Sequence, residues 1–326
     1  MFSKILALGA VAAFPTINIK EDGKPKTLYI VGADWYTPTG GDTMDIPHGG
    51  RSYLATSDSL GPDNFYGLNM LGGSIAYDVD LSNSGCSCNA ALYLISMPGL
   101  DFDGHPSKGG GDYYCDANNV GGQWCPEFDI MEANTYAWHT TPHMCDSKTD
   151  KGHYNHCDQS GSCFQIAKQK LDGQYGPGGQ FKINTLQQFH VKISFEESGH
   201  FKVEMSQNGQ TISMASDSSC DSYINSIKGD LYNNMAIAVS SWGGSYGDMS
   251  WLDQDTGCQG ECTNSPTVNI RNIEYTSGSG KPGPDPPTPG DFTFGQECAT
   301  ARDDDCSQVS CKEHMCKWSW PSNDPA

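Results

Sequence analysis

Alternating hydrophobic and polar residues between positions 189 and 205 constrain the fold of this chain most strongly. In residues 189–195, FHVKISF, every second side chain is hydrophobic, which is the two-residue period of a half-buried β-strand. After the break EESG the pattern returns in residues 201–205, FKVEM, and Asn208-Gly209 then supplies a hairpin turn. This stretch therefore predicts consecutive strands, one face of which packs on a core.

Other segments repeat the strand pattern, whereas helical patterns are rare. Residues 75–79 alternate in the same way, and the best helical candidate is residues 222–232. Further strand-like runs are residues 91–97, 235–242 and 267–275. Many short strands joined by Gly-rich turns predict an all-β fold, either a sandwich or a jelly roll. With 326 residues, the chain is long enough to bury a large core.

The chain divides into a large body and a small C-terminal tail. Residues 277–291, SGSGKPGPDPPTPGD, have the composition of a semi-rigid Gly/Pro linker. They separate a body of residues 14–276 from a tail of residues 292–326, which holds four cysteines, Trp318 and Trp320. A segment of that size cannot hold a core, so we expect it to rely on disulfides.

The first residues, MFSKILALGAVAAF, indicate export. One lysine precedes a short apolar run, and Ala10-Val11-Ala12 resembles a cleavage site, so we expect a signal peptide over about residues 1–13. A buried N-terminal strand is the alternative. The even number of cysteines, 14, agrees with a secreted protein that contains disulfides. No apolar run reaches membrane-spanning length, so we expect no membrane association.

Charge and metal-ligand spacing exclude several other classes of function. The net charge is −20 and no cluster of Lys and Arg is visible, which argues against a nucleic-acid partner. Residues 152–163, GHYNHCDQSGSC, offer two histidines and two cysteines to zinc, but disulfides are the better explanation in an exported chain. DFDG, residues 101–104, lacks the other ligands of a calcium loop. We therefore expect neither a metal nor a cofactor.

Three carboxylates occur close together in residues 125–134, CPEFDIMEAN. In a strand, Glu127 and Asp129 point to one face, whereas Glu132 has the opposite parity. One extra residue, a β-bulge at Ile130-Met131, would return Glu132 to the face of the other two acids. The backbones of Glu127 and Glu132 would then lie roughly 13 Å apart, at about 3.3 Å per residue.

Such a trio matches the chemistry of retaining glycoside hydrolysis, which needs two carboxyl groups roughly 5 Å apart. Glu127 would attack the anomeric carbon, and Glu132 would protonate the leaving oxygen and later activate water. Asp129 would hydrogen-bond Glu127 and adjust both pKa values through like-charge coupling. The alternatives are a solvated acidic strand edge and a calcium site, because E-x-D-x-x-E alone is a weak pattern.

Beyond this motif the chain resembles family 7 of the glycoside hydrolases, which comprises secreted cellobiohydrolases and endoglucanases of cellulose breakdown. The resemblance covers roughly residues 68–276. Besides CPEFDIMEAN, it is carried by TPHMC (141–145), MLGGSIAYDVDLS (70–82), ALYLISM (91–97), QYGPGGQFKINT (174–185), MAIAVSSWGGSYGDMSWLD (235–253) and TVNIRNIEY (267–275).

The resemblance implies a β-jelly-roll sandwich with a concave glucan-binding cleft and a retaining mechanism. It places the nucleophile, its partner and the acid/base on Glu127, Asp129 and Glu132. It places a histidine near the cleaved sugar on His143, and two cleft tryptophans on Trp242 and Trp251.

General chemistry supports aromatic residues in such a cleft, because flat indole rings match the apolar faces of glucose. The alternative for Trp242 and Trp251 is a place in the core. We also name Trp138, next to the catalytic strand, and Tyr246 and Asp248, beside the two tryptophans, as substrate-binding candidates.

The chain also departs from the family pattern. It is short, and the segment before the catalytic strand is brief, which favours an open groove and internal cleavage over processive release from chain ends. The family's product-side arginine is absent near residues 258–262, and the tryptophan before the acid/base is replaced by Met131. Both changes bear on how sugar binds on the product side.

We therefore predict a secreted, monomeric, retaining endo-β-1,4-glucanase whose partner is a cellulose-like β-glucan. The alternatives are a β-1,3 or mixed-linkage glucanase or transglycosylase of the related clan, and a non-catalytic glucan-binding wall protein. For the tail, the alternatives are a small glucan-binding module, a cap and an anchor to wall material.

Overall fold

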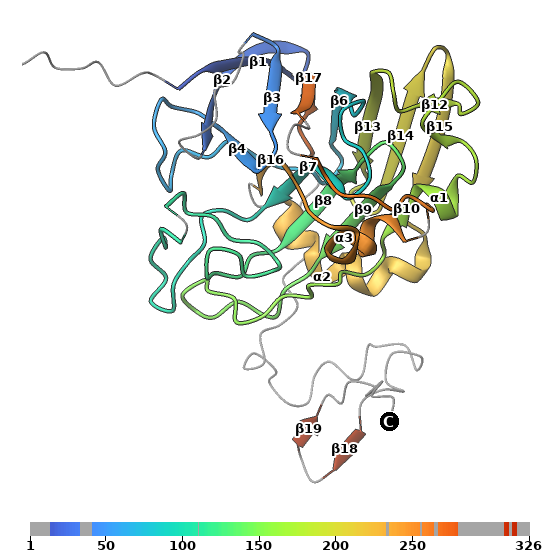
Figure 1. Ribbon diagram of the computed structural model, residues 1–326. Helices are drawn as coiled ribbons and strands as arrows, with labels where there is room; N and C mark the ends of the chain where they lie inside the picture. Colours follow the sequence, from blue (N-terminus) through green and yellow to red (C-terminus); the bar gives the residue numbers. More distant parts are fainter. Residues whose placement is uncertain are drawn as a thin grey trace, which may run out of the picture. The chain divides into compact units, whose positions relative to one another are not determined.

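The computed structural model describes residues 14–32, 41–109, 111–232, 235–254, 256–263 and 267–279, together with two short strands near the C-terminus (Figure 1). The chain forms two units, residues 1–282 and residues 283–326. The predicted signal peptide lies outside the described residues, as do residue 280 onward of the predicted linker, Trp318 and Trp320.

The large unit is built mainly from strands. Its strands are β1 (Thr16–Glu21), β2 (Lys24–Gly32), β3 (Thr43–Pro47), β4 (Gly50–Ala55), β5 (Gly67–Leu68), β6 (Ser74–Asp80), β7 (Cys88–Ile95), β8 (Glu127–Ala133), β9 (Trp138–His143), β10 (Gln165–Ile166), β11 (Tyr175–Gly176), β12 (Ile183–Asn184), β13 (Phe189–Phe195), β14 (Phe201–Gln207), β15 (Gln210–Ala215), β16 (Met235–Gly243) and β17 (Thr267–Thr276). The helices are α1 (Ala167–Lys170), the 3-10 turn η1 (Ser218–Cys220), α2 (Asp221–Tyr232) and α3 (Tyr246–Asp253). In the small unit, β18 (Ser310–Lys312) pairs antiparallel with β19 (Met315–Lys317).

The predicted all-β fold is confirmed. Most strands of the large unit join one curved 15-stranded sheet, in which the order β10-β9-β8-β7-β16-β4-β2-β1-β17-β6-β13-β14-β15 forms the main path. β13 and β14 begin where the alternating pattern predicted, and α2 coincides with the predicted helix. Between β14 and β15, Asn208 and Gly209 have positive φ values of 49° and 77°, as the predicted hairpin turn requires.

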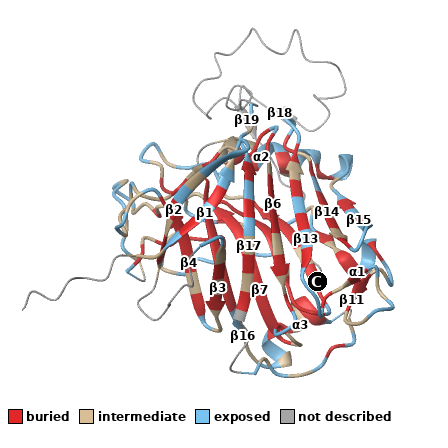
Figure 2. Cartoon of the chain, turned by 90° about the horizontal axis from the view of Figure 1, so that it is seen from above, coloured by how far each residue is buried: buried red, intermediate tan, exposed pale blue. Residues whose placement is uncertain are grey.

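The sheet curves so that its two halves pack against each other around one core. Phe128 on β8 has its ring centroid 5.0 Å from the centroids of both Phe195 on β13 and Phe201 on β14. Figure 2 shows β7 red along its length, whereas the buried residues of β6 and β17 are interspersed with less buried ones. Burial of the inner face of β8 leaves its other face free to line a site.

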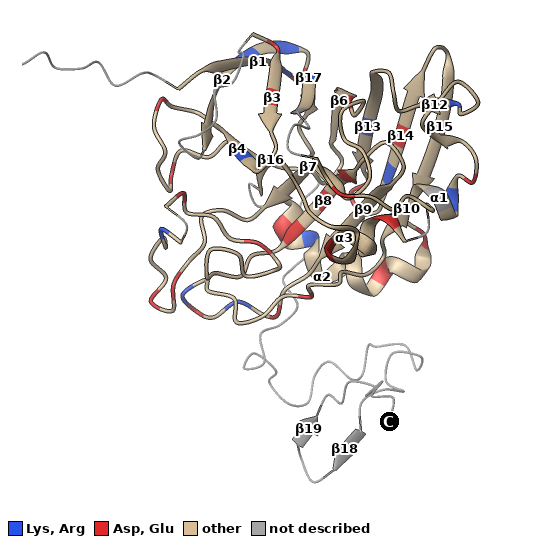
Figure 3. Cartoon of the chain, viewed as in Figure 1, with Lys and Arg blue, Asp and Glu red and all other residues tan. Residues whose placement is uncertain are grey.

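Among the residues that the structure describes, five disulfides connect loops and strand ends. They join Cys86 to Cys258, Cys88 to Cys262, Cys115 to Cys125, Cys145 to Cys157, and Cys163 to Cys220. Cys157 and Cys163, which were the two cysteines available to zinc, are thus both in disulfides. Among the described residues no group of three His, Cys, Asp or Glu is placed to hold a metal, and no described helix has the length and apolarity to cross a bilayer. Over the same residues, Figure 3 shows Lys and Arg spread over separate strands and loops.

Candidate active site

The β-bulge predicted at Ile130-Met131 is present in β8. Against β7 the register passes from Met131, opposite Leu92, directly to Asp129, opposite Tyr93. Against β9 it also shifts between Asp129 and Glu132. Ile130 and Met131 both join the buried core, whereas Glu127, Asp129 and Glu132 line a cavity on the other face. The bulge therefore turns Glu132 to the same side as the two acids before it.

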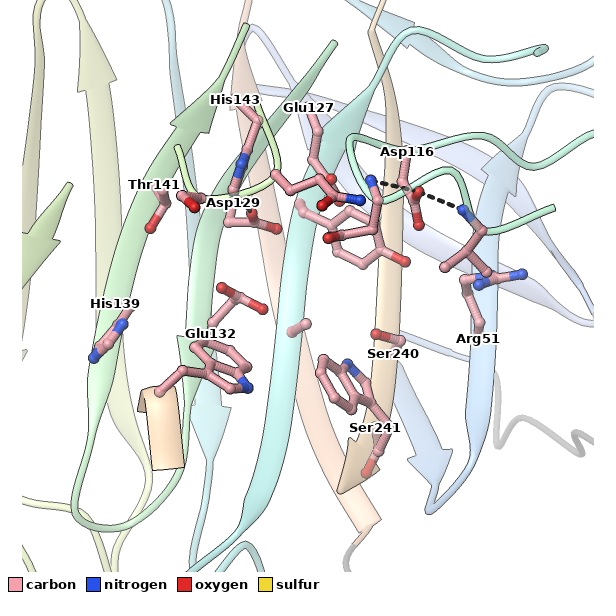
Figure 4. Close-up of a pocket in the computed structure, with 18 of the residues that line it drawn as sticks. Arg51, Asp116, Glu127, Asp129, Glu132, His139, Thr141, His143, Ser240 and Ser241 are labelled. Carbon is pink, nitrogen blue, oxygen red and sulfur yellow. Dashed lines mark hydrogen bonds and ion pairs between the residues drawn. The ribbon is translucent and has the colours of Figure 1, made fainter. Parts of the chain in front are cut away.

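The cavity has a volume of about 750 Å³ and lies over β8 and its neighbours (Figure 4). Strand β9 lines one wall with His139, Thr141 and His143, which alternate with residues that face the core. In the ladder between β8 and β9, Glu127 is opposite His143 and Glu132 is opposite His139. Each glutamate thus has a histidine as its cross-strand neighbour.

Glu127 is buried and accepts a hydrogen bond from the backbone. The backbone N–H of Ala117 donates to its Oε2 at 3.0 Å. Burial raises the pKa of Glu127 well above its ordinary value, and the charge of Asp129 raises it further, while His143 opposes both effects. The donor and the histidine favour the carboxylate form of this residue against the cost of burial.

Asp129 forms a pair with His143. Oδ2 of Asp129 lies 2.9 Å from Nε2 of His143, and both side chains are almost fully buried. Nδ1 of His143 is 2.8 Å from the backbone carbonyl oxygen of Asp158, which can only accept, so Nδ1 carries a proton. Nε2 and Asp129 therefore share a further proton, because a bare nitrogen lone pair would repel a carboxylate at this distance.

Glu132 is held from the neighbouring strand β7. Nδ2 of Asn89, which is fully buried, donates to Oε1 of Glu132 at 2.9 Å. Burial, reinforced by the negative charge of Asp129, raises the pKa of Glu132 to about 8. This carboxyl group therefore keeps its proton near neutral pH, as a general acid must.

A fourth acid, Asp116, is buried in the wall beside Glu127 and was not anticipated from the sequence. Its Oδ1 accepts the backbone N–H groups of Asn118 and Val120, each at 2.9 Å (Figure 4). Burial raises its pKa, and its charge raises the pKa of Glu127 and Asp129. Neighbouring carboxylates in one buried site do not all ionise together, so the cluster retains protons.

Aromatic rings line the end of the cavity near Glu132. The rings of Trp242 and Trp251 stack with centroids 6.1 Å apart and an angle of 27° between their planes. His139 meets Trp251 edge-on, with centroids 5.9 Å apart. Trp242 is 41% exposed, and both tryptophans line the cavity, while Trp251 also packs against the buried cluster of Ala137, Met249 and Leu252.

At another part of the cavity wall, Arg51 from β4 is fixed among tyrosines. Its guanidinium carbon lies 3.4 Å from the ring centroid of Tyr114, and Nη2 is 3.3 Å from Oδ2 of Asp112. Tyr53 donates its hydroxyl to the same Oδ2 at 2.7 Å. A cation held over an aromatic ring and against a carboxylate keeps a defined orientation toward the cavity.

The structure does not bring three of the predicted substrate-binding residues into the cavity wall. Trp138 is fully buried in the core, so the prediction that it binds substrate was wrong. Because five positions separate Trp138 from His143, their side chains point to opposite faces of β9. Tyr246 and Asp248 lie in the first turn of α3. Oδ2 of Asp248 accepts a hydrogen bond from the cap residue Ser245 at 2.7 Å, which directs it to the helix N-terminus.

This fold and site define a jelly-roll protein with a carboxylate-lined cleft, and comparison with known proteins gives the same class. No family model matches the chain. It is 28% identical over 267 residues to endoglucanase EG-1 of Humicola insolens, covering 64% of this chain and 61% of that protein. It is 29% identical over 279 residues to the endo-β-1,4-glucanase celB of Aspergillus oryzae, covering 70% of this chain and 65% of that protein. The chain thus spans about three fifths of the length of the first of these relatives.

A solved structure gives the same result for the fold. The crystal structure of a GH7 family cellobiohydrolase from Daphnia pulex superposes with a TM-score of 0.62 at 20% identity, covering 84% of this chain and 99% of that one. Sequence relatives and fold together confirm the resemblance of this chain to family 7 of the glycoside hydrolases.

Proposed function

We propose that this protein is a retaining β-glucanase that hydrolyses internal β-1,4-glucosidic bonds of cellulose or a related glucan. The observation that carries the proposal is the bulge in β8, which gathers Glu127, Asp129 and Glu132 on the face that lines the cavity. Two carboxyl groups on either side of a glycosidic bond are the requirement of this chemistry. The names of the two relatives above support the β-1,4 linkage and the internal point of cleavage.

In the first step, the carboxylate of Glu127 attacks the anomeric carbon while Glu132 gives its proton to the departing oxygen. The bond from carbon to the leaving oxygen breaks as the bond to Glu127 forms, which leaves a covalent glycosyl-enzyme. In the second step Glu132, now a carboxylate, removes a proton from water. The water oxygen then attacks the same carbon, and Glu127 leaves as a carboxylate.

The surrounding groups support this division of roles. Glu127 has the Ala117 N–H as a donor to its negative charge, whereas Glu132 has a pKa of about 8 and holds its proton. The proton shared by Asp129 and His143 offsets part of the negative charge beside Glu127. Once water has displaced the sugar from Glu127, Glu127 is again a carboxylate and Glu132 again carries its proton.

The cavity walls supply binding groups on both sides of the acids. Trp242, Trp251 and His139 lie at the Glu132 end, where they would contact the leaving part of the glucan. Arg51 and Tyr114 line another part of the wall and would contact the part that is transferred. Residues 258–262 contain no arginine. Binding of the leaving part of the glucan would therefore rest on aromatic rings rather than on a cation.

Five disulfides support secretion of the protein. We propose that it acts as a monomer on an open groove. The cysteine-rich tail remains a candidate glucan-binding module, cap or wall anchor.

The proposal is tested by comparing wild type with Glu127→Gln on soluble cellulose derivative, mixed-linkage glucan and laminarin, following viscosity and released reducing ends. The matched control is Glu204→Gln, a partly exposed glutamate on β14 whose Oε1 pairs with Lys202. We expect a rapid fall in viscosity on the β-1,4 substrates with wild type and control, and at least about a thousandfold loss of rate in Glu127→Gln.

Other results would point to the alternative functions. Turnover confined to laminarin would assign the protein to β-1,3-glucan. Binding without turnover in both wild type and Glu127→Gln would make it a glucan-binding wall protein. Equal turnover by wild type and Glu127→Gln would remove Glu127 from the mechanism.

A further inference from the structure

Behind the bulge of β8, two buried side chains of β9 form a short hydrogen-bonded chain. The indole Nε1 of Trp138 donates to Oγ1 of Thr140 at 3.0 Å. Oγ1 of Thr140 in turn donates to the backbone carbonyl oxygen of Ile130 at 2.8 Å. Trp138 and Thr140 are both fully buried. Neither touches the cavity, because their side chains face the core side of β9.

The carbonyl that ends this chain belongs to the extra residue of the bulge. The β7 register passes from Met131 to Asp129, so Ile130 is the residue that interrupts the ladder. On the other side, Thr140 is the single residue of β9 between the partners of Asp129 and Glu132. A bulge disrupts regular pairing, and a buried carbonyl at such a point needs a partner. The hydroxyl of Thr140 supplies it.

The hydroxyl is oriented from both sides. Because Oγ1 accepts the Trp138 N–H, its own hydrogen is free to point at the Ile130 carbonyl. The indole is itself fixed in the core, with its centroid 6.2 Å from those of Tyr175 and Phe189. Threonine is also restricted at χ1 by its β-branch. The position of the bulge is thus tied to the packed core.

We propose that Thr140, oriented by Trp138, is a positioning residue that holds the β8 bulge and thereby aims Glu132 at the glycosidic bond. The inference rests on the proposed function, since it assigns these residues to the same reaction. It also gives Trp138 a role in the reaction, although this residue is buried in the core and does not line the cavity. A displacement of about 1 Å at a reacting group costs about a hundredfold in rate, so small changes of the bulge have measurable effects.

The test compares Thr140→Val, which keeps the shape and removes the hydroxyl, with Thr140→Ser, which keeps the hydroxyl. The matched control is Thr185→Val, because Thr185 is equally buried and donates to the backbone carbonyl of Thr135 at 2.7 Å, away from the bulge. We expect Thr140→Val to lower kcat by about ten- to a hundredfold with little change in KM. Thr140→Ser should recover most of the activity, and Thr185→Val should lose Tm but keep kcat.

A second readout does not depend on turnover. In Thr140→Val, NMR titration of isotope-labelled glutamate should show the pKa of Glu132 falling from about 8 toward its ordinary value of 4.5, as the side chain leaves its buried place. Trp138→Phe, which removes the indole N–H, should shift both readouts in the same direction by less.

The outcomes separate the two proposals. If wild type hydrolyses glucan but Thr140→Val keeps its kcat, or falls only as Thr185→Val does, the positioning role is wrong. If wild type hydrolyses no glucan, the proposed function fails and the titration decides the positioning role. A fall in the Glu132 pKa in Thr140→Val, absent from Thr185→Val, would then support it, and an unchanged pKa would overturn it.

Discussion

Nε2 of His143 lies 2.9 Å from Oδ2 of Asp129, while Nδ1 of the same ring is held by the carbonyl oxygen of Asp158. This arrangement fixes the tautomer of the imidazole and places one proton between the ring and the carboxyl group. The charge state of the catalytic acids therefore depends on a histidine that need not touch the bond being broken.

Replacing Asp129 by Asn tests this relationship. The negative charge of Asp129 raises the pKa of Glu132, so its removal should lower that pKa and move the alkaline limb of activity to lower pH. We expect kcat to fall by about ten- to a hundredfold, the usual cost of losing a hydrogen bond to a charged group. A pH–rate profile on a soluble β-1,4-glucan measures both effects. An unshifted alkaline limb would contradict the coupling.

Replacing Glu132 by Gln tests the general acid. Loss of the proton donor should lower kcat by about a hundred- to ten-thousandfold on glucan. The first step with a dinitrophenyl cellobioside should fall far less, because that leaving group departs without a proton. Burst kinetics on the two substrates separate these steps. Equal losses on both would mean that Glu132 does not protonate the leaving oxygen.

The buried acids also predict how stability changes with pH. Burial raises the pKa values of Glu127, Asp129 and Glu132 in the folded protein, so folding favours their protonated forms. Stability from this source is present below the ordinary pKa of Glu132, 4.5, and is lost as pH rises toward about 8. Tm of wild type should therefore fall across this range, and Tm of Glu132→Gln should fall less. Parallel Tm profiles would contradict the raised pKa of Glu132.

His139 and Trp251 provide a prediction about the leaving side of the cleft. Since the two rings meet edge-on next to Glu132, replacement of either by Ala should weaken inhibition by cellobiose by about tenfold, equivalent to about 1.4 kcal/mol. His190→Ala is the control, because His190 lies on β13 and pairs with Asp78 away from the cavity. Inhibition constants unchanged in both cleft variants would place the leaving sugar elsewhere.

Much of the catalytic strand was predictable from sequence. The parity of Glu127, Asp129 and Glu132 requires a bulge if all three share a face, and β8 has that bulge. The same parity rule, applied from His143 back along β9, would have put Trp138 in the core, as the structure does.

The remaining wall of the site depends on long-range contacts that no local pattern reveals. Arg51 comes from the distant strand β4, and Asp116 comes from the loop that leads into β8; both meet the acids only because β4 and this loop line the same cavity. α3 was missed for a different reason. Its glycine-containing start resembles a turn, yet Ser245 accepts the N–H of Asp248 and begins a helix.

The most direct test of the central claim is to trap the covalent intermediate. Wild type would be treated with a fluorinated, slowly hydrolysed cellobioside and its peptides examined by mass spectrometry. We predict one glycosyl group per chain, attached to the peptide that contains Glu127, and none in Glu127→Gln. Active protein with a label on another residue, or with inversion of the anomeric configuration, would contradict retaining catalysis by Glu127.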